Sequence, residues 1–277
     1  MGTKIIVDSC CDMTDSMKKE MGLSVVPLTL MLGEREFVDD ETLQLPEFMK
    51  AMKACTDKVG SASPSPYRYA CAMEENQESF VVTLSSQLSG SYSSAVLGKS
   101  MAEENKGVNA YVLDSKSASA GQTLITLTLH KLLAQGLPKE EIIHAIHHFI
   151  DHMKTYFVLE RYDNLQKNGR LNKLTGKIAH ILNIKLIMGA DGNGNIALFD
   201  KPRGTAKMID KLLSFIEKSG KDTTGENIVI AHCNNPALAE RLADAIKNRF
   251  RFADIHIVPT GGVSSLYADE KGIIMAF

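Results

Sequence analysis

The sequence predicts an α/β fold in which two α/β domains carry mainly parallel sheets. Apolar, β-branched runs alternate with helix-like segments along the chain, which is typical of strands joined by crossover helices. Several runs, such as residues 4–9 and 80–84, are apolar at almost every position, as in strands buried on both faces of a parallel sheet. The length of 277 residues fits about two domains of roughly 150 residues each.

A change of character near residue 160 predicts domains of residues 1–160 and 161–277. Upstream of this point the predicted strands end in serine and aspartate, and hydroxyl-rich loops follow them. Downstream, a hairpin appears and lysine and arginine become frequent. We therefore expect the loops of the first domain to contact the ligand.

Strands are predicted where short β-branched runs are bounded by turn residues, and helices where apolar residues recur three and four apart. The expected strands are residues 4–9, 24–32, 80–84, 110–114, 155–159, 184–190, 195–200, 227–232, 254–258 and 273–277. The expected helices are residues 45–54, 92–104, 119–135, 139–152, 172–182, 205–218 and 236–249. Residues 191–195, Asp-Gly-Asn-Gly-Asn, predict a hairpin turn. They do not predict a calcium loop, because Ile196 and Pro202 stand where such a loop needs Gly and Glu.

The composition excludes several classes of protein. A net charge of −2 gives no reason to expect nucleic acid as a partner. Five cysteines without CxxC spacing argue against a zinc site or a disulfide framework, and they fit a cytoplasmic location. The first residues lack a long apolar run, so we expect neither a signal peptide nor insertion into a membrane.

The hydroxyl-rich stretch of residues 85–95 is the leading candidate for ligand contact. It follows an apolar strand and opens a helix, so its N–H groups and hydroxyls are expected at the carboxyl end of a parallel sheet. No Lys or Arg lies between Arg68 and Lys99, which favours a carboxyl group over a phosphate. The alternative is that these serines only cap the helix.

Three other loops have the same character, at residues 7–12, 60–66 and 114–121. Each taken alone is a turn or a cap. Since the carboxyl ends of parallel strands lie on one side of a sheet, the four loops together predict a shared polar pocket.

Two further features leave alternatives open. His144, His148 and His152 are four residues apart and line one face of a predicted helix, which we expect to be a solvated face rather than a native metal site. Arg170 follows Asn168 and Gly169, and is either a capping cation or a contact for an acidic ligand or partner. The Gly/Ser-rich stretch of residues 259–272 is weak evidence on its own.

The motifs, taken in order, resemble the DegV family of bacterial fatty-acid-binding proteins over essentially the whole chain. The stretches that carry the resemblance are IVDSCCDM, VVPLTL, GSASPSP, LSSQLSGSYSSA, VLDSKSASAG, LQKNGRL and GGVSSLYADEKGIIMAF. The resemblance implies two α/β domains with a lipid site at their junction. It also implies a long-chain fatty acid as the bound ligand, with no other cofactor and no metal, and a separate fatty acid kinase as the partner that performs the catalysis.

The resemblance also implies which residues meet the carboxyl group. Ser61 keeps a hydroxyl where the family has Thr, whereas Ala62 loses one. The Ser-Ser-x-Leu-Ser-Gly motif is intact, so Ser89 and the backbone of Gly90 are the expected contacts. No catalytic residue is implied.

Two more positions concern the kinase step and a departure from the family pattern. Arg170 is preserved and is implied to contact the kinase partner. Some members carry a His-x-Gly-Pro-Gly loop, but residues 268–272 begin with Ala268, so no His is available there.

The function expected is that of a fatty acid carrier which presents the carboxyl group to a kinase for phospholipid synthesis. The alternative is a serine-dependent hydrolase or acyltransferase, for which His232 is the only candidate base at the end of a strand. Thirteen methionines and no tryptophan predict a soft, adaptable interior for an acyl chain. The methionines expected in the wall of a lipid tunnel are Met31, Met49, Met52, Met73, Met188 and Met208.

Overall fold

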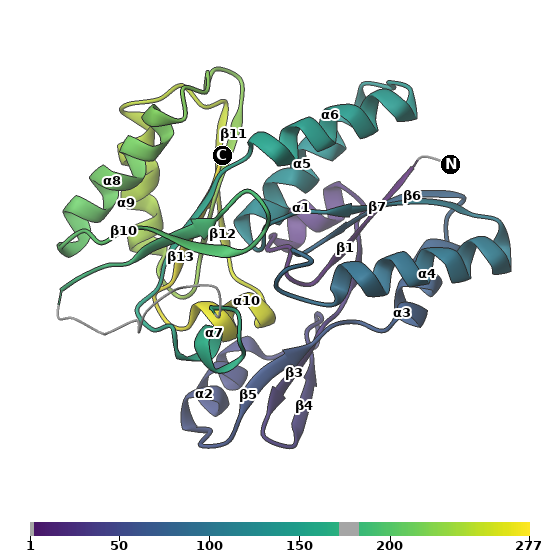
Figure 1. Cartoon of the computed structure of the whole chain (residues 1–277), viewed down its shortest axis with the longest axis horizontal. Coiled ribbons are helices and arrows are strands. Elements are labelled where there is room, and N and C mark those ends of the chain that lie inside the picture. Colours follow the sequence, from purple (N-terminus) through teal and green to yellow (C-terminus); the bar gives the residue numbers. More distant parts are fainter. Residues whose placement is uncertain (1–2, 172–182) are drawn as a thin grey trace.

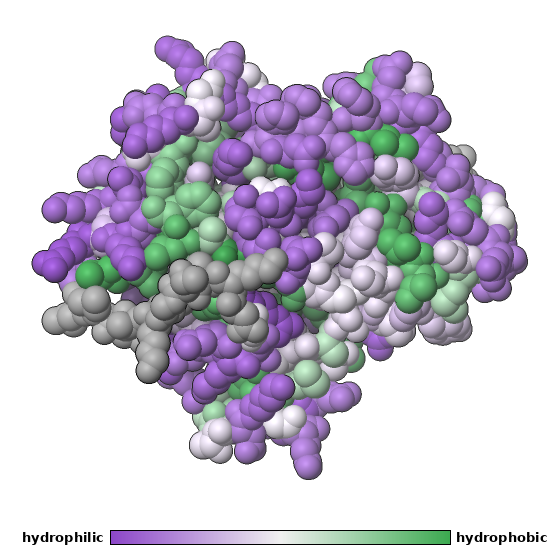
Figure 2. Space-filling view, in the orientation of Figure 1, coloured by the Kyte–Doolittle hydropathy of each residue, from purple (hydrophilic) through white to green (hydrophobic). Residues whose placement is uncertain are grey.

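The computed structural model describes residues 3–171 and 183–277, which form an α/β protein with three sheets (Figure 1). One sheet has four strands, one has six, and a small one has three. Hydrophilic residues cover most of the face shown in Figure 2, with smaller hydrophobic areas between them.

The four-stranded sheet is parallel throughout, with the order β2-β1-β6-β7. Its strands are β1 (Lys4–Asp8), β2 (Ser24–Val26), β6 (Glu78–Thr83) and β7 (Asn109–Asp114). Its helices are α1 (Asp15–Glu20), α3 (Pro66–Glu74), α4 (Ser91–Lys106), α5 (Ala120–Ala134) and α6 (Lys139–His152). Side chains of β1 alternate between two apolar layers: Ile5 and Val7 pack with residues of α5 and α6, and Ile6 packs with residues of α3 and α4. Burial on both faces is why these strands are apolar at almost every position.

The six-stranded sheet has the order β10-β9-β8-β13-β11-β12. Its strands are β8 (Thr155–Val158), β9 (Ile187–Ala190), β10 (Ile196–Asp200), β11 (Asn227–His232), β12 (Asp254–Pro259) and β13 (Ile273–Ala276). Only β11 and β12 pair in parallel, and the other pairs are antiparallel, so this sheet is mixed. Residues of α8 (Gly204–Lys218) and α9 (Pro236–Lys247) pack on one face.

A three-stranded antiparallel sheet completes the fold, with the order β4-β3-β5. Its strands are β3 (Thr29–Leu32), β4 (Arg35–Val38) and β5 (Val59–Ala62). The helices beside it are α2 (Leu45–Ala54), α7 (Asp163–Lys167) and α10 (Gly262–Ala268). Figure 1 shows this unit at the bottom of the molecule, and α10 contacts α2, α7 and β3.

Helix α5 connects the two large sheets. It packs against β1 and β6 of the parallel sheet and against β11 and β13 of the mixed sheet. Strand β8 precedes residue 160 in the sequence, yet it pairs with β13 and β9. The division of the chain at residue 160 stays a prediction.

The predicted α/β class is confirmed, and most of the predicted elements are present. The expectation of mainly parallel sheets was wrong, because only the four-stranded sheet is parallel throughout. The expected strand at residues 24–32 is two strands, β2 and β3, which belong to different sheets. The turn expected at residues 60–66 begins inside β5 (Val59–Ala62), so that prediction was wrong for Gly60, Ser61 and Ala62. The sequence did not predict five of the elements, because their patterns are too short or too polar to recognise: α1, α3, α7, α10 and β4. The helix predicted at residues 172–182 lies outside the described residues.

Candidate functional site

A cavity of about 870 Å³, counted with its open mouth, lies between the parallel sheet, the mixed sheet and α10. Most of its wall is apolar. The apolar side chains that line it are Leu28, Leu84, Leu88, Ala118, Phe157, Leu159, Leu165, Ala190, Ile196, Val263, Ala268 and Ile274.

All four of the predicted hydroxyl-rich stretches contribute to the wall of this cavity, through Cys10, Ser61, Ser89 and Ser117. The first, third and fourth follow the parallel strands β1, β6 and β7, as expected. Ser61 instead reaches the cavity from within the antiparallel strand β5. The cavity wall also contains residues from the far end of the chain, such as Ile274 on β13.

One part of the cavity wall joins two hydroxyls and a cation. The Ser61 hydroxyl on β5 lies 2.9 Å from the Tyr267 hydroxyl on α10. The Arg170 guanidinium lies over the Tyr267 ring, 5.1 Å from its centroid. Arg170 Nε donates to the Leu88 carbonyl oxygen at 3.2 Å and Nη1 donates to that of Asn168 at 2.8 Å. These contacts fix a positive charge beside the hydroxyls.

Ser89 and Gly90 stand at the start of α4, next to Leu88 in the chain. Ser89 Oγ accepts a hydrogen bond from the Ser91 N–H at 3.2 Å, and Gly90 is the N-cap residue and is exposed. The first N–H groups of this long helix favour a negative charge. Ser61, Ser89, Tyr267 and Arg170 line the cavity and form what we call its polar end, whereas Gly90 is not one of the lining residues.

Asp8 positions the loop that carries Ser89. Its carboxylate accepts from the Leu84 N–H at 2.8 Å, from the Ser91 hydroxyl at 2.7 Å and from Gln122 Nε2 at 2.9 Å. Burial raises the pKa of Asp8, and these hydrogen bonds offset part of that rise. The Ser91 hydroxyl also lies 2.6 Å from the Tyr69 hydroxyl, so the start of α4 is fixed to α3.

Two buried carboxylates hold the start of α10. Asp39 accepts from the N–H groups of Gly262 and Val263, both at 2.9 Å, and Asp12 accepts from that of Gly261 at 2.7 Å. Glycine is needed at 262, because a Cβ there would collide with the Asp39 carboxylate. Burial raises the pKa of Asp39 and raises that of Asp12 to about 7.

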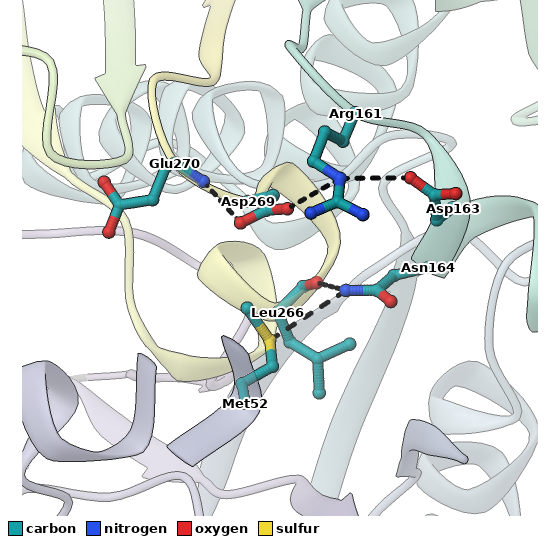
Figure 3. Close-up of polar contacts among 7 residues, drawn as sticks. All are labelled: Met52, Arg161, Asp163, Asn164, Leu266, Asp269 and Glu270. Atoms are coloured by element: carbon teal, nitrogen blue, oxygen red, sulfur yellow. Dashed lines mark hydrogen bonds and ion pairs between the residues drawn. The ribbon is translucent and has the colours of Figure 1, made fainter. Parts of the chain in front are cut away.

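The other end of α10 is held by polar contacts from α7 and the segment before it (Figure 3). Asn164 Nδ2 donates to the Leu266 carbonyl oxygen at 2.7 Å. Arg161 Nε lies 3.2 Å from the Asp163 carboxylate and 3.8 Å from that of Asp269. Because α10 is held at both ends, its side chains Val263 and Tyr267 have fixed positions in the cavity wall.

A second polar region lines the cavity, but its groups bind one another. Lys116 Nζ donates to the Asp151 carboxylate at 2.7 Å, which lowers the pKa of Asp151. The Ser117 hydroxyl lies 2.8 Å from that of Thr155. Lys116 is therefore paired with a carboxylate, and each of these two hydroxyls has the other as a partner.

Two expectations from the sequence need correction. None of the six methionines expected in the tunnel wall lines the cavity, and five of them are buried in the cores that pack the sheets and helices together. The local absence of lysine and arginine around residues 85–95 did not predict the charge at the site, because Arg170 arrives from a distant segment. Tyr267 was missed as well, although it is the only aromatic residue in the stretch of residues 259–272.

The rival sites have little support in the part of the chain that the structure describes. The rings of His148 and His152 stack, with centroids 4.1 Å apart, on the exposed face of α6, and residues 3–171 and 183–277 contain no group of three or more potential metal ligands. Among the described residues that line the cavity there is no histidine, so His232 is not beside Ser89. Over the same residues, no helix combines the length and the apolar character needed to cross a bilayer.

Comparison with known proteins covers the whole chain. A family model described as the uncharacterised DegV family matches residues 2–276. A DegV domain-containing protein of Streptococcus pyogenes serotype M18 is 36% identical over 280 residues, with 100% of this chain and 99% of that protein covered.

Two solved structures share the fold. A DegV family protein from Ruminococcus gnavus, refined with vaccenic acid, has a TM-score of 0.94 and 38% identity, and 99% of each chain is covered. The Streptococcus pneumoniae Fatty Acid Kinase B3 protein, loaded with linoleic acid, has a TM-score of 0.91 and 36% identity, with 100% of this chain and 99% of that chain covered.

Proposed function

The chain belongs to the DegV family, and from this premise we propose that it binds a long-chain fatty acid in the cavity and acts as a carrier. The observation that supports this most strongly is the distribution of polarity in the cavity wall. Apolar side chains make up most of the wall, whereas the hydroxyls of Ser61 and Tyr267 and the guanidinium of Arg170 lie together at the polar end. An acyl chain with a carboxyl group has the same distribution.

Burial of the acyl chain supplies the affinity. Each buried methylene contributes about 0.8 kcal/mol, so a chain of about 15 methylenes gives at most roughly 12 kcal/mol before the cost of ordering. Leucine, isoleucine, valine and phenylalanine side chains supply the matching wall. A buried carboxyl without donors would lose roughly 1–3 kcal/mol, so the head group needs the polar end.

The carboxyl group is assigned to Ser61, Ser89 and the backbone of Gly90. Arg170 supplies a positive charge within the same group of residues. Gly90 is exposed, so a carboxyl group held there lies near the surface. That position suits presentation to a separate fatty acid kinase, with Arg170 as the contact for the partner. A cytoplasmic location, predicted from the five cysteines, fits this role.

Extraction and mass spectrometry test the proposal directly. We expect freshly purified protein to release a long-chain fatty acid into organic solvent, and delipidated protein to rebind linoleic acid. Ser89→Ala is expected to weaken rebinding by roughly 10- to 150-fold, because a hydrogen bond to a charged group contributes about 1.5–3 kcal/mol.

The control is Ser93→Ala, since Ser93 is an exposed hydroxyl on the same helix. Thermal unfolding of both variants separates a binding defect from the loss of the Ser89 contact with the Ser91 N–H. Absence of any lipid in the extract, together with failure to bind added linoleic acid, would contradict the proposal. Unchanged affinity in Ser89→Ala would remove only Ser89 from the site.

A further inference from the structure

Tyr267 lines the cavity wall beside Ser61 and Arg170. It directly precedes Ala268, the position at which some family members carry a histidine. We propose that the Tyr267 hydroxyl donates a hydrogen bond to the carboxyl group of the bound fatty acid, and thereby selects free acids over esters. This inference rests on the proposed function. The neighbouring Ala268 also lines the cavity, but its methyl group has no proton to donate.

The hydroxyl pair has a proton to spare. Ser61 and Tyr267 each carry one hydroxyl proton, and the 2.9 Å contact between them uses one. Whichever hydroxyl accepts within the pair keeps its own proton for another acceptor. When Ser61 donates to Tyr267, the more acidic phenol proton is directed to a ligand carboxylate.

The surroundings keep the phenol protonated and in place. Burial raises the pKa of Tyr267 above its usual value, so the hydroxyl remains a donor at neutral pH. The Arg170 guanidinium packs on the ring face, and Asp39 and Asn164 hold the two ends of α10. A donor fixed in this way loses little freedom when the ligand binds.

The proposed contact predicts selectivity by head group. A carboxylate accepts hydrogen bonds strongly, whereas a methyl ester carries no charge and adds bulk at the same atom. Loss of the Tyr267 hydroxyl should therefore weaken the binding of the acid and leave the binding of the ester almost unchanged. A tyrosine that only packs against the acyl chain would affect both ligands equally.

The test compares linoleic acid with methyl linoleate on delipidated full-length protein. Tyr267→Phe is expected to raise the Kd for linoleic acid about tenfold and the Kd for methyl linoleate less than twofold. The matched control is Tyr67→Phe, because Tyr67 is 68% exposed and lies outside the cavity wall. Urea unfolding confirms that each variant is folded before binding is measured.

Ser61→Ala and the double variant give an independent measurement. Because the two hydroxyls share one hydrogen bond, the double variant should lose less affinity for linoleic acid than the product of the two single losses. A loss of affinity in the double variant equal to the product of the two single losses would show that the two hydroxyls do not act through a shared hydrogen bond. An unchanged Kd for linoleic acid in Tyr267→Phe, or equal losses of affinity for acid and ester, would overturn the assignment of Tyr267. If the wild-type protein still binds linoleic acid in that case, the proposed carrier function stands. Wild-type protein that binds neither ligand would remove the proposed function and this inference together.

Discussion

At the scale of single residues, Asp12 and Asp39 hold the start of α10, a helix that lines the cavity. Both are buried, and both accept hydrogen bonds from the backbone at the start of α10. Asp12 also accepts from the Ser119 hydroxyl at 2.5 Å, which connects α10 to the start of α5. The titration of Asp12 therefore changes the energy of a contact that shapes the cavity.

Asp12 predicts a specific dependence of stability on pH. Its pKa is raised by burial from 3.8 to about 7, so the folded protein binds this proton more tightly than the unfolded chain does. The resulting stabilisation is complete below about pH 4 and is lost as the pH rises through about 7. We expect wild-type protein to lose stability relative to Asp12→Asn between pH 5 and pH 8, by at most about 1.4 kcal/mol per pH unit.

Urea unfolding at pH 5, 6, 7 and 8 measures this difference. Asp210→Asn, which changes an exposed carboxylate on α8, is the control and should follow the wild-type curve. Parallel curves for wild type and Asp12→Asn would show that the Asp12 carboxyl does not titrate in this range.

Local sequence predicted some of these residues and could not predict others. Ser89 and Gly90 were recognisable because a strand, a hydroxyl-rich loop and a helix follow one another in the chain. Arg170 and Tyr267 join them only through tertiary contacts across long separations in sequence. Arg170 was a candidate contact from the sequence, but no local pattern places it beside Ser61, and Tyr267 was not expected at all.

At the scale of elements, α10 shows why a Gly/Ser-rich stretch can be a helix. Residues 259–272 have the composition of a loop, and propensity alone disfavours a helix there. Buried carboxylates compensate by accepting from the first N–H groups of the helix, as capping residues do. Gly262 allows the Asp39 carboxylate to approach, because a Cβ at this position would collide with it.

Gly262→Ala tests this explanation. The added Cβ would collide with Asp39, Leu43 and Leu30, so the carboxylate must move away from the helix. We expect a loss of roughly 1–3 kcal/mol in the free energy of unfolding, as for other overpacked sites. Urea denaturation at constant pH measures the loss.

Gly261→Ala is the matched control. Its Cβ would lie 3.3 Å from Asp12 Oδ1, which requires only a small adjustment. We expect a clearly smaller loss of stability than for Gly262→Ala. Equal losses, or no loss at 262, would mean that the approach of Asp39 does not depend on the glycine.

At the scale of the whole molecule, the cavity belongs to both halves of the chain. Its wall contains Leu84 and Ser117 from the loops of the parallel sheet, and Phe157 and Ile274 from the mixed sheet. Helix α5 packs against both sheets as well. The periodicity of the sequence predicted the α/β layers. It did not predict that β8 pairs with β13, because neither strand's own residues specify its partner.

This arrangement predicts that a fatty acid stabilises the whole chain at once. Linoleic acid at about 100 times its Kd should add about 2.7 kcal/mol, which raises the Tm by roughly 5 °C for a protein of this size. Differential scanning calorimetry of delipidated and loaded protein should show one transition that moves as a unit. Decanoic acid at the same concentration should produce a smaller shift, because it buries fewer methylenes.

Two separate transitions, of which only one responds to the lipid, would contradict a cavity shared by both halves. A rise in Tm that is the same for decanoic and linoleic acid would indicate that the apolar wall does not hold the acyl chain.

The place of β13 in the mixed sheet has a consequence for synthesis on the ribosome. This strand follows every other element of the mixed sheet in sequence, yet it lies between β8 and β11 and supplies Ile274 to the cavity wall. The parallel sheet emerges first and can begin to fold while translation continues. The mixed sheet stays divided until β13 has been synthesised, so a nascent chain that lacks β13 has an incomplete cavity wall.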